Sequence, residues 1–175
     1  MKKFKRIRFY SKKYIADYEK HYLSLLYRFK EYEYDKANCL ISYRNHVLSI
    51  ISGEPDEYKF SYKGFLCFIG RHPLYKHLCG YVCFNRLNNR IILDSYNDIQ
   101  VHGGITYVGK ANGVWNNKFR HNDMFIGFDC NHCYDFSPNL SLHYDDDISY
   151  KTIDYCIIQC KLMVDQILRN HIDIK

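Results

Sequence analysis

The run Met124-Phe-Ile-Gly-Phe128 is apolar throughout and is shorter than a typical helix. Four further runs in the middle of the chain share its wealth of aromatic and β-branched residues, and Gly, Asn and Asp separate them. They are residues 65–69, 80–84, 91–93 and 101–108. Short runs of this kind, bounded by turn residues, are typical of antiparallel strands. The sequence therefore predicts a central, mostly antiparallel sheet, with a hairpin loop at Asn88-Asn89.

Helical patterns flank the predicted sheet on both sides. Over residues 15–33, apolar positions recur at steps of three and four, which predicts an amphipathic helix. The same spacing recurs over residues 149–169. There the acidic residues come first and Arg169 closes the segment, as the helix dipole favours. We therefore expect a helix at each end of the chain.

One segment before the sheet is ambiguous, because residues 38–52 fit a short helix about as well as a strand. The turn residues Gly53-Glu-Pro-Asp56 end that segment. No repeat, linker or change in composition divides the chain. We therefore expect a single α+β domain over residues 1–175, with a sheet core at about 60–136 and the N- and C-terminal helices packed on it.

The composition excludes several classes of protein. The chain has 175 residues and 47% of them are hydrophobic, which fits one globular domain and excludes a disordered chain. No apolar run approaches the roughly 20 residues of a membrane-spanning helix, and the N-terminus has no export signal. We therefore expect a cytoplasmic protein without a membrane partner, whose eight cysteines are thiols.

Basic residues gather at the N-terminus of this chain. The formal net charge is +6, and seven Lys or Arg lie within residues 1–13. Such a tract can contact nucleic acid, a phosphorylated ligand or an acidic partner. It has no aromatic stacking motif or groove-reading helix beside it, so we favour a solvated terminus and expect no nucleic-acid partner. A homo-oligomer is left open.

Three stretches carry more polar residues than a strand needs for folding. The first is Arg71-His-Pro-Leu-Tyr75, which follows an apolar run. Pro73 favours extended backbone at His72, so the imidazole could point into a cleft; the alternative is a turn histidine on the surface. If a ligand binds here, Arg71 is a candidate to hold phosphate and Tyr75 to stack on a base.

The second stretch is Val101-His-Gly-Gly-Ile-Thr-Tyr107. Two glycines inside a strand-like run mark either a β-bulge or a place where a ligand approaches the backbone. In the ligand-binding interpretation, the amides of Gly103 and Gly104 bind an anion, with His102 before them and Thr106 after them. The sequence leaves both interpretations open.

The third stretch is Phe125-Ile-Gly-Phe-Asp-Cys-Asn-His-Cys-Tyr-Asp135. Asp129, His132 and Asp135 bring two carboxylates and an imidazole to the end of a strand. This combination suits a divalent metal, or a general base with its orienting partner. We expect any metal to bind at these three residues, and we expect folding to require none.

The cysteines do not strengthen the case for a structural metal. Cys130 and Cys133 form a C-x-x-C motif, but no second such motif completes a zinc site. The setting of a thioredoxin-like redox motif is also missing. Cys156 and Cys160 share the apolar face of the C-terminal helix, so we expect them to be core thiols.

Four segments together resemble a family of small, uncharacterised proteins common in phages and prophages. They are His72-Pro-Leu-Tyr75, Leu78-Cys-Gly-Tyr-Val82, Val101-His-Gly-Gly-Ile-Thr-Tyr107 and Ile126-Gly-Phe-Asp-Cys-Asn-His132. The resemblance spans about residues 65–168, and HGG-x-T and GFD-x-x-H are its most specific elements. Met124 and Phe125 stand where that family often has a Trp pair, and Lys76 where it often has Gly. The resemblance implies a phage or mobile-element setting and supplies no reaction.

Small phage proteins often counter host defence, and two mechanisms would use these residues. In the first, the histidines and Asp129 hydrolyse a phosphodiester or similar bond in a nucleotide-like small molecule. In the second, the protein sequesters such a nucleotide without cleaving it. A third class, a protein–protein inhibitor, would need none of the histidines. We expect hydrolysis, because imidazoles beside carboxylates serve proton transfer near neutral pH.

The hydrolysis hypothesis makes a geometric prediction. The candidate catalytic residues lie at the ends or bulges of strands in one sheet, so we expect them to share one cleft. The residues expected to converge there are His102, Thr106, Asp129 and His132, with His72 on the rim.

Overall fold

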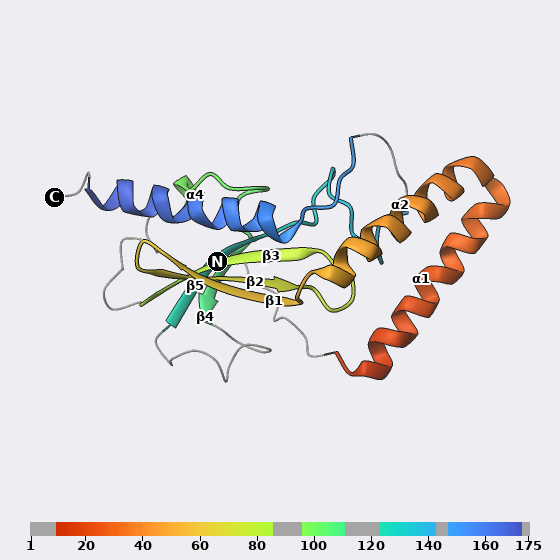
Figure 1. The fold of residues 1–175 in the computed structure, drawn as a ribbon, viewed down its shortest axis with the longest axis horizontal. Helices are drawn as coiled ribbons and strands as arrows, with labels where there is room; N and C mark the ends of the chain where they lie inside the picture. The colour runs from red at the N-terminus through yellow and green to blue at the C-terminus, as the bar shows by residue number, and fades with distance from the viewer. Residues whose placement is uncertain (1–9, 86–95, 111–122, 143–146, 173–175) are drawn as a thin grey trace.

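A computed structural model describes residues 10–85, 96–110, 123–142 and 147–172, and it confirms the α+β class (Figure 1). A five-stranded sheet lies at its centre, in the order β1-β2-β3-β5-β4, and all neighbouring strands are antiparallel. The strands are β1 (Glu57–Tyr62), β2 (Phe65–Arg71), β3 (Leu78–Asn85), β4 (Tyr107–Lys110) and β5 (Asp123–Asp129).

Three of these strands, β2, β3 and β5, coincide with apolar runs of the sequence. The run at 101–108 does not behave as one strand, because only its last residues enter β4. Gly103 and Gly104 have positive φ angles of 63° and 82°, which an extended strand cannot contain. The prediction of a strand from Val101 is therefore wrong up to Thr106. The run at 91–93 and Asn88-Asn89 lie outside the described residues.

The helices of the described residues are α1 (Lys12–Tyr32), α2 (Tyr34–Gly53) and α4 (Ile153–Ile172), with a short 3₁₀ turn η1 (Tyr96–Asp98). The segment that was ambiguous in the sequence is helical and belongs to α2. Both predicted terminal helices are confirmed. The first begins three residues earlier than expected, and the last is displaced towards the C-terminus.

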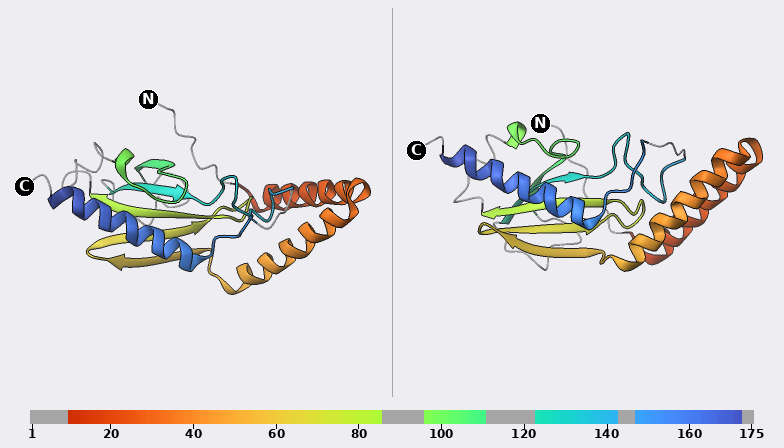
Figure 2. Two further views of the ribbon diagram at one scale, coloured as in Figure 1. Left: turned by 90° about the horizontal axis from the view of Figure 1, so that it is seen from above. Right: turned by 45° about the horizontal axis from the view of Figure 1, so that its top comes forward.

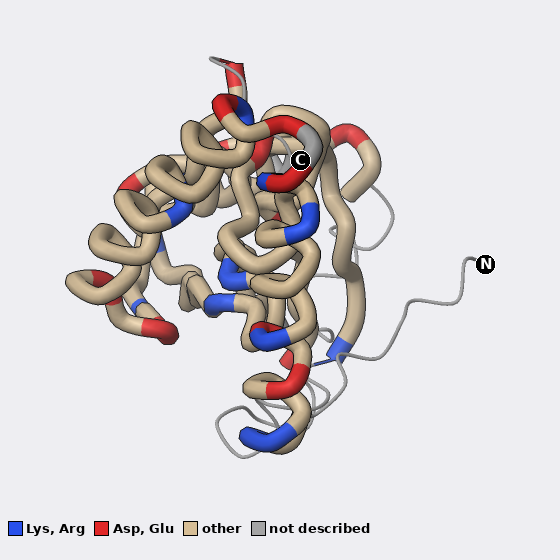
Figure 3. Tube along the Cα trace, turned by 90° about the vertical axis from the view of Figure 1, so that its right-hand side faces the viewer, with Lys and Arg blue, Asp and Glu red and all other residues tan. Residues whose placement is uncertain are grey.

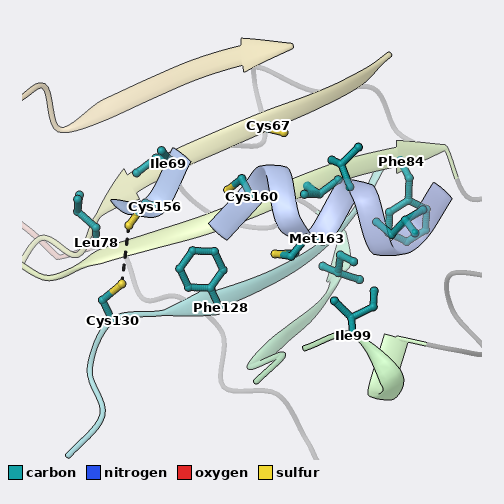
Figure 4. Packing of buried hydrophobic residues seen from close by; sticks show 14 of the residues in the cluster. Cys67, Ile69, Leu78, Phe84, Ile99, Phe128, Cys130, Cys156, Cys160 and Met163 are labelled. Atoms are coloured by element: carbon teal, nitrogen blue, oxygen red, sulfur yellow. Dashed lines mark hydrogen bonds between the residues drawn. The ribbon is translucent and has the colours of Figure 1, made fainter. Parts of the chain in front are cut away.

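Helix α4 covers one face of the sheet and forms the main core with it (Figure 4). Gly80 permits this close packing, because a Cβ there would lie 2.4 Å from the ring of Phe128 and 3.0 Å from the sulfur of Cys160. Cys156 and Cys160 are fully buried, as predicted. The sulfur of Cys156 lies 3.7 Å from that of Cys130, which follows β5.

Helices α1 and α2 form a hairpin that projects beyond the end of the sheet (Figures 1 and 2). It builds a second core with the segment between β5 and α4, and Phe136 and Tyr150 bring that segment into the core. Arg44 of α2 donates to the carbonyl of Pro138 at 2.8 Å and to Oδ1 of Asn139 at 2.8 Å. The hairpin thus clamps the segment that leaves the sheet at the end of β5.

Charged residues of both signs are spread over all three helices (Figure 3). Most of the basic N-terminal tract, residues 1–9, lies outside the described residues, while Lys12 and Lys13 open α1. Among the described helices, none combines the length and the apolar character that crossing a membrane requires.

Candidate functional site

Two imidazoles and one carboxylate meet at the edge of the sheet and α4. His102 Nε2 lies 2.7 Å from Asp135 Oδ2, and His132 Nδ1 lies 3.2 Å from the same oxygen. The two imidazole rings are 5.2 Å apart and nearly perpendicular. These three residues, which we call the His–Asp cluster, come from two separate loops, one before β4 and one after β5.

Helix α4 holds His102 in place from two sides. The amide of His102 donates to Oε1 of Gln159 at 3.0 Å. The hydroxyl of Tyr155 lies 2.9 Å from Nδ1 of His102, and the two rings meet edge to face. Both ring nitrogens of His102 therefore have a partner, which fixes the orientation of the imidazole.

The loop after β5 positions the other two residues of the cluster. The amide of Asp135 donates to the carbonyl of His132 at 3.0 Å, so the backbone turns back on itself. Asp135 also forms a parallel bridge with Ser149. Its neighbour Phe136 is buried in the second core. The carboxylate is thus fixed at the junction of the two cores.

Gly103 is what allows the two loops to meet. A Cβ atom at this position would lie 1.9 Å from Cε1 of His132, so any side chain would displace the imidazole. The backbone there also has a positive φ of 63°, which L side chains rarely adopt. The group that closely approaches Gly103 is the His132 imidazole of the same chain, and ligand binding at the glycine pair stays a prediction.

Asp135 is nearly enclosed, with a side chain that is 2% exposed. Oδ2 lies near both imidazoles and accepts from the His132 amide at 2.9 Å. Oδ1 is buried and accepts no hydrogen bond from the described residues, and Lys151 Nζ lies 3.7 Å from it. Burial alone would raise the pKa of Asp135, but hydrogen bonds from His102 and from the His132 amide hold it below its usual range.

The three side chains of the cluster differ in their exposure to solvent. The side chain of His132 is 34% exposed, whereas that of His102 is 16% exposed. A molecule in solution therefore meets the edge of His132 first. Tyr155 and Lys151 both lie beside the cluster, because the Tyr155 hydroxyl is 2.9 Å from His102 Nδ1 and Lys151 Nζ is 3.7 Å from Asp135 Oδ1. Burial raises the pKa of Tyr155, so the hydroxyl keeps its proton at neutral pH.

Asp129 does not join this cluster. It follows Phe128, which packs against α4, so its side chain belongs to the opposite face of the sheet. Its Oδ1 accepts from the amide of Asn131 at 3.1 Å, which caps the turn after β5. The expected convergence of His102, Thr106, Asp129 and His132 on one cleft is therefore not what the structure has. Asp135 takes the place beside the imidazoles that the sequence assigned to Asp129.

His72 lies on the face that Asp129 shares, within a stack of rings. It is stacked on Tyr75 at 4.6 Å and on His77 at 4.9 Å. Its Nδ1 accepts from the amides of Leu74 and Tyr75, which closes a tight turn. Burial lowers the pKa of His72, and the charge of Asp129 opposes this shift. His72 and Tyr75 thus belong to a stack of rings, and its member His77 lies near enough to His132 and Asp135 for their charges to act on its pKa.

Arg71 is occupied by the protein itself. Its guanidinium is 2% exposed and pairs with Glu54 at 2.9 Å and Asp56 at 3.0 Å. It also donates to the hydroxyl of Tyr150 and to the carbonyl of Lys76. This network ties α2, β1 and β2 to the segment before α4. The structure gives Arg71 a structural role in place of the expected phosphate contact.

The remaining two predicted ligand-binding residues lie next to the cluster. The amide of Gly104 donates to the carbonyl of Val101 at 2.9 Å, so it is used within the turn. Thr106 donates its amide to the carbonyl of Gly127 and leads into β4, with an exposed side chain. Neither residue forms the anion-binding concavity that the sequence suggested.

Sequence reasoning missed the contribution of α4 to the site. Tyr155 and Gln159 are four residues apart, so both face the loop that carries His102. They form a polar edge beside the apolar face of the same helix, which is the signal that could have identified them. Lys151 lies one turn before Tyr155, in the segment that enters α4.

The arrangement has two chemical capabilities. A carboxylate that orients an imidazole serves proton transfer. One ligand atom from each of His102, His132 and Asp135 lies within 4.8 Å of the others, so the cluster could hold a metal ion. Comparison with protein-family models, with curated proteins and with solved structures finds no match for this chain.

Proposed function

We propose that the His–Asp cluster hydrolyses a phosphodiester or similar bond in a nucleotide-like small molecule. The observation that carries this proposal is the convergence of two imidazoles on one buried carboxylate, with one imidazole edge open to solvent. Such a set activates water either by taking its proton or by holding a metal that lowers the pKa of the water. Both routes place a hydroxide-like nucleophile beside His132.

A phosphoryl group fits the charges around this nucleophile. Lys151 Nζ donates to Oγ of Ser149 at 2.6 Å and lies 3.7 Å from Asp135 Oδ1, so its ammonium is held close to the cluster. An ammonium in that position can attract a phosphate oxygen and stabilise the charge that develops on it. The ring of Tyr155 beside it offers a surface on which a base could stack.

The biological setting belongs to the same proposal and rests on the sequence resemblance to phage and prophage proteins. In that setting, cleavage of a nucleotide signal of the host would counter its defence. Sequestration of the same molecule would have a similar benefit, so an experiment must separate the two.

Product analysis on a nucleotide panel tests the proposal. The protein is incubated with cyclic and linear dinucleotides and with bis(p-nitrophenyl) phosphate, and the products are resolved by chromatography. The sample is then denatured by heat and analysed again. We expect cleaved products with the wild type and a loss of about a hundredfold or more with His132→Ala.

His21→Ala is the matched control, because His21 is an exposed histidine on α1, remote in sequence and in the fold from the cluster. It should cleave like the wild type. Recovery of intact nucleotide only after heating would replace hydrolysis with sequestration. Equal turnover in wild type and His132→Ala would remove the His–Asp cluster from the reaction.

A further inference from the structure

We infer that the His–Asp cluster binds one divalent transition-metal ion of the Zn²⁺ class, through His102 Nε2, His132 Nδ1 and the carboxylate of Asp135. This inference deepens the proposed function and rests on it for the use of the metal, although binding itself can be measured without turnover. It differs from the metal site expected from the sequence, because His102 replaces Asp129 as a ligand.

The first support for a metal ion is that the two oxygens of the Asp135 carboxylate have different surroundings. Both imidazoles direct a ring nitrogen at Oδ2, at 2.7 and 3.2 Å. Within the described part of the chain the buried Oδ1 accepts no hydrogen bond, and Lys151 Nζ lies 3.7 Å from it. A buried carboxylate oxygen without a hydrogen bond is costly in a folded protein. A cation bound between the two imidazoles and the carboxylate would balance the buried negative charge and use all three groups as ligands.

The distances are those of a ligand set that needs only small shifts. The three ligand atoms lie within 4.8 Å of one another. Ligand atoms about 2.1 Å from a shared Zn²⁺ are about 3.4 Å apart at the tetrahedral angle. His102 Nε2 and Asp135 Oδ2, now 2.7 Å apart, would therefore separate by about 0.7 Å, within the range of side-chain motion.

Tyr155 completes the geometry expected around a metal-bound histidine. A ligating imidazole usually donates a hydrogen bond from its second ring nitrogen to an oxygen atom, and this bond fixes the orientation of the ring. The Tyr155 hydroxyl lies 2.9 Å from Nδ1 of His102, so its oxygen can accept a hydrogen bond from Nδ1–H when Nε2 binds a metal. The hydroxyl does not touch the ion in this arrangement, so Tyr155 is a positioning residue.

The donor types select the class of metal. Mg²⁺ and Ca²⁺ prefer shells made of oxygen atoms, whereas imidazole suits Zn²⁺ and its transition-metal neighbours. Catalytic zinc sites typically have three protein ligands, for example two imidazoles and one carboxylate, and leave one position for water. The partly exposed His132 provides the route by which ion and water enter.

Metal titration of the chelated protein tests the inference. Protein dialysed against a chelator and then freed of it is titrated with Zn²⁺ in a calorimeter and with Co²⁺ in a spectrophotometer. We expect one ion per chain and a visible Co²⁺ spectrum of four-coordinate nitrogen and oxygen ligation. The chelated protein should stay folded, because the main core contains none of the three ligands.

Variants assign the ligands. His102→Ala, His132→Ala and the nearly isosteric Asp135→Asn should each weaken Zn²⁺ binding by a hundredfold or more, and Tyr155→Phe by about tenfold. His21→Ala and Cys133→Ser should bind like the wild type, and Cys133→Ser tests whether the exposed thiol next to His132 is the real ligand. Circular dichroism confirms that each variant is folded.

Two results would overturn the inference, and they differ from failure of the proposed function. The wild type could bind Zn²⁺ no better than Asp135→Asn, or binding could disappear in Cys133→Ser. Full-rate cleavage of phosphodiesters by the chelated wild type would overturn only the use of the metal in the reaction. Zn²⁺ bound at the cluster without turnover of any panel member would instead sustain the metal site and refute hydrolysis.

Discussion

The described part of the chain contains two pairs of neighbouring histidines, and the same side chain has a different role in each. His72 and His77 stack on one another and on Tyr75, and the enclosed His77 is 5% exposed. His102 and His132 meet edge to face instead, and both point a ring nitrogen at Asp135.

The difference lies in what faces the imidazole nitrogens. In the stacked pair, backbone amides and a serine hydroxyl near 3.4 Å are the partners, and burial keeps the rings neutral. In the other pair, both rings contact one buried carboxylate, and the His132 ring is partly exposed to solvent. Histidines near a strand end therefore become a candidate site only where a carboxylate and access coincide.

Replacement of Asp135 by asparagine, compared with the same replacement at Asp129, should produce the largest effect on activity. Asp135→Asn removes the charge that orients both imidazoles, so we expect kcat/KM for a phosphodiester to fall by about a thousandfold. Asp129→Asn keeps the oxygen that caps the turn after β5 and should leave kcat/KM nearly unchanged. The comparison is made by steady-state kinetics with both variants on the same substrate. A greater loss in Asp129→Asn would move the active site to the opposite face of the sheet.

Acid should destabilise the protein through the stacked pair. Burial lowers the pKa of His77 to about 3, whereas the unfolded chain binds a proton near the ordinary value of about 6.5. Stability is therefore lost as the pH falls from about 6.5 towards 3, by up to about 1.4 kcal/mol per pH unit from this residue. Between pH 6 and pH 4 we expect a loss of about 2–3 kcal/mol, measured by urea unfolding at several pH values.

His77→Phe isolates this contribution, because Phe keeps a ring in the stack and has no charge to gain. Its unfolding free energy should depend less steeply on pH over the same interval. His21→Ala should keep the slope of the wild type. Identical slopes in wild type and His77→Phe would show that His77 is protonated in the folded protein.

The two adjacent glycines provide the smallest and most selective test. Alanine at either position adopts a positive φ, which costs about 1 kcal/mol of stability in each variant. Only the Cβ at Gly103 meets His132, since nothing lies within 4 Å of a Cβ at Gly104. We therefore expect Gly103→Ala to weaken Zn²⁺ binding by about tenfold, and Gly104→Ala to bind like the wild type. Equal Zn²⁺ affinities of the two variants would mean that His132 can move away from Gly103→Ala without weakening the cluster.

Local sequence was sufficient for most of the fold. Strands β2, β3 and β5 are short apolar runs between turn residues, and α1 and α4 repeat apolar residues at helical spacing, so the pattern appears within ten to twenty residues. Residues 38–52 were ambiguous because the buried face of α2, which includes Leu40, Arg44 and Val47, contains an arginine and so does not appear as a regular apolar pattern. The loop at 101–106 was predicted as a strand because it contains apolar residues at strand-like spacing, and the sequence does not show that Gly103 and Gly104 have positive φ angles.

The sequence by itself determined the α+β class, the buried positions of Cys156 and Cys160 and the three stretches from which site residues came. It included His102, His132 and Asp135 among the candidates, because polar residues at strand ends are distinctive without any knowledge of contacts.

Only the tertiary structure decided which of those residues meet. The face of a strand alternates with every residue, so a shift of one position separates Asp129 from Phe128 and places its carboxylate opposite α4. Asp135 reaches the imidazoles because the chain turns back after His132 and is clamped by the α1–α2 hairpin. Such partnerships depend on contacts between residues far apart in the chain, and local sequence carries no direct record of them.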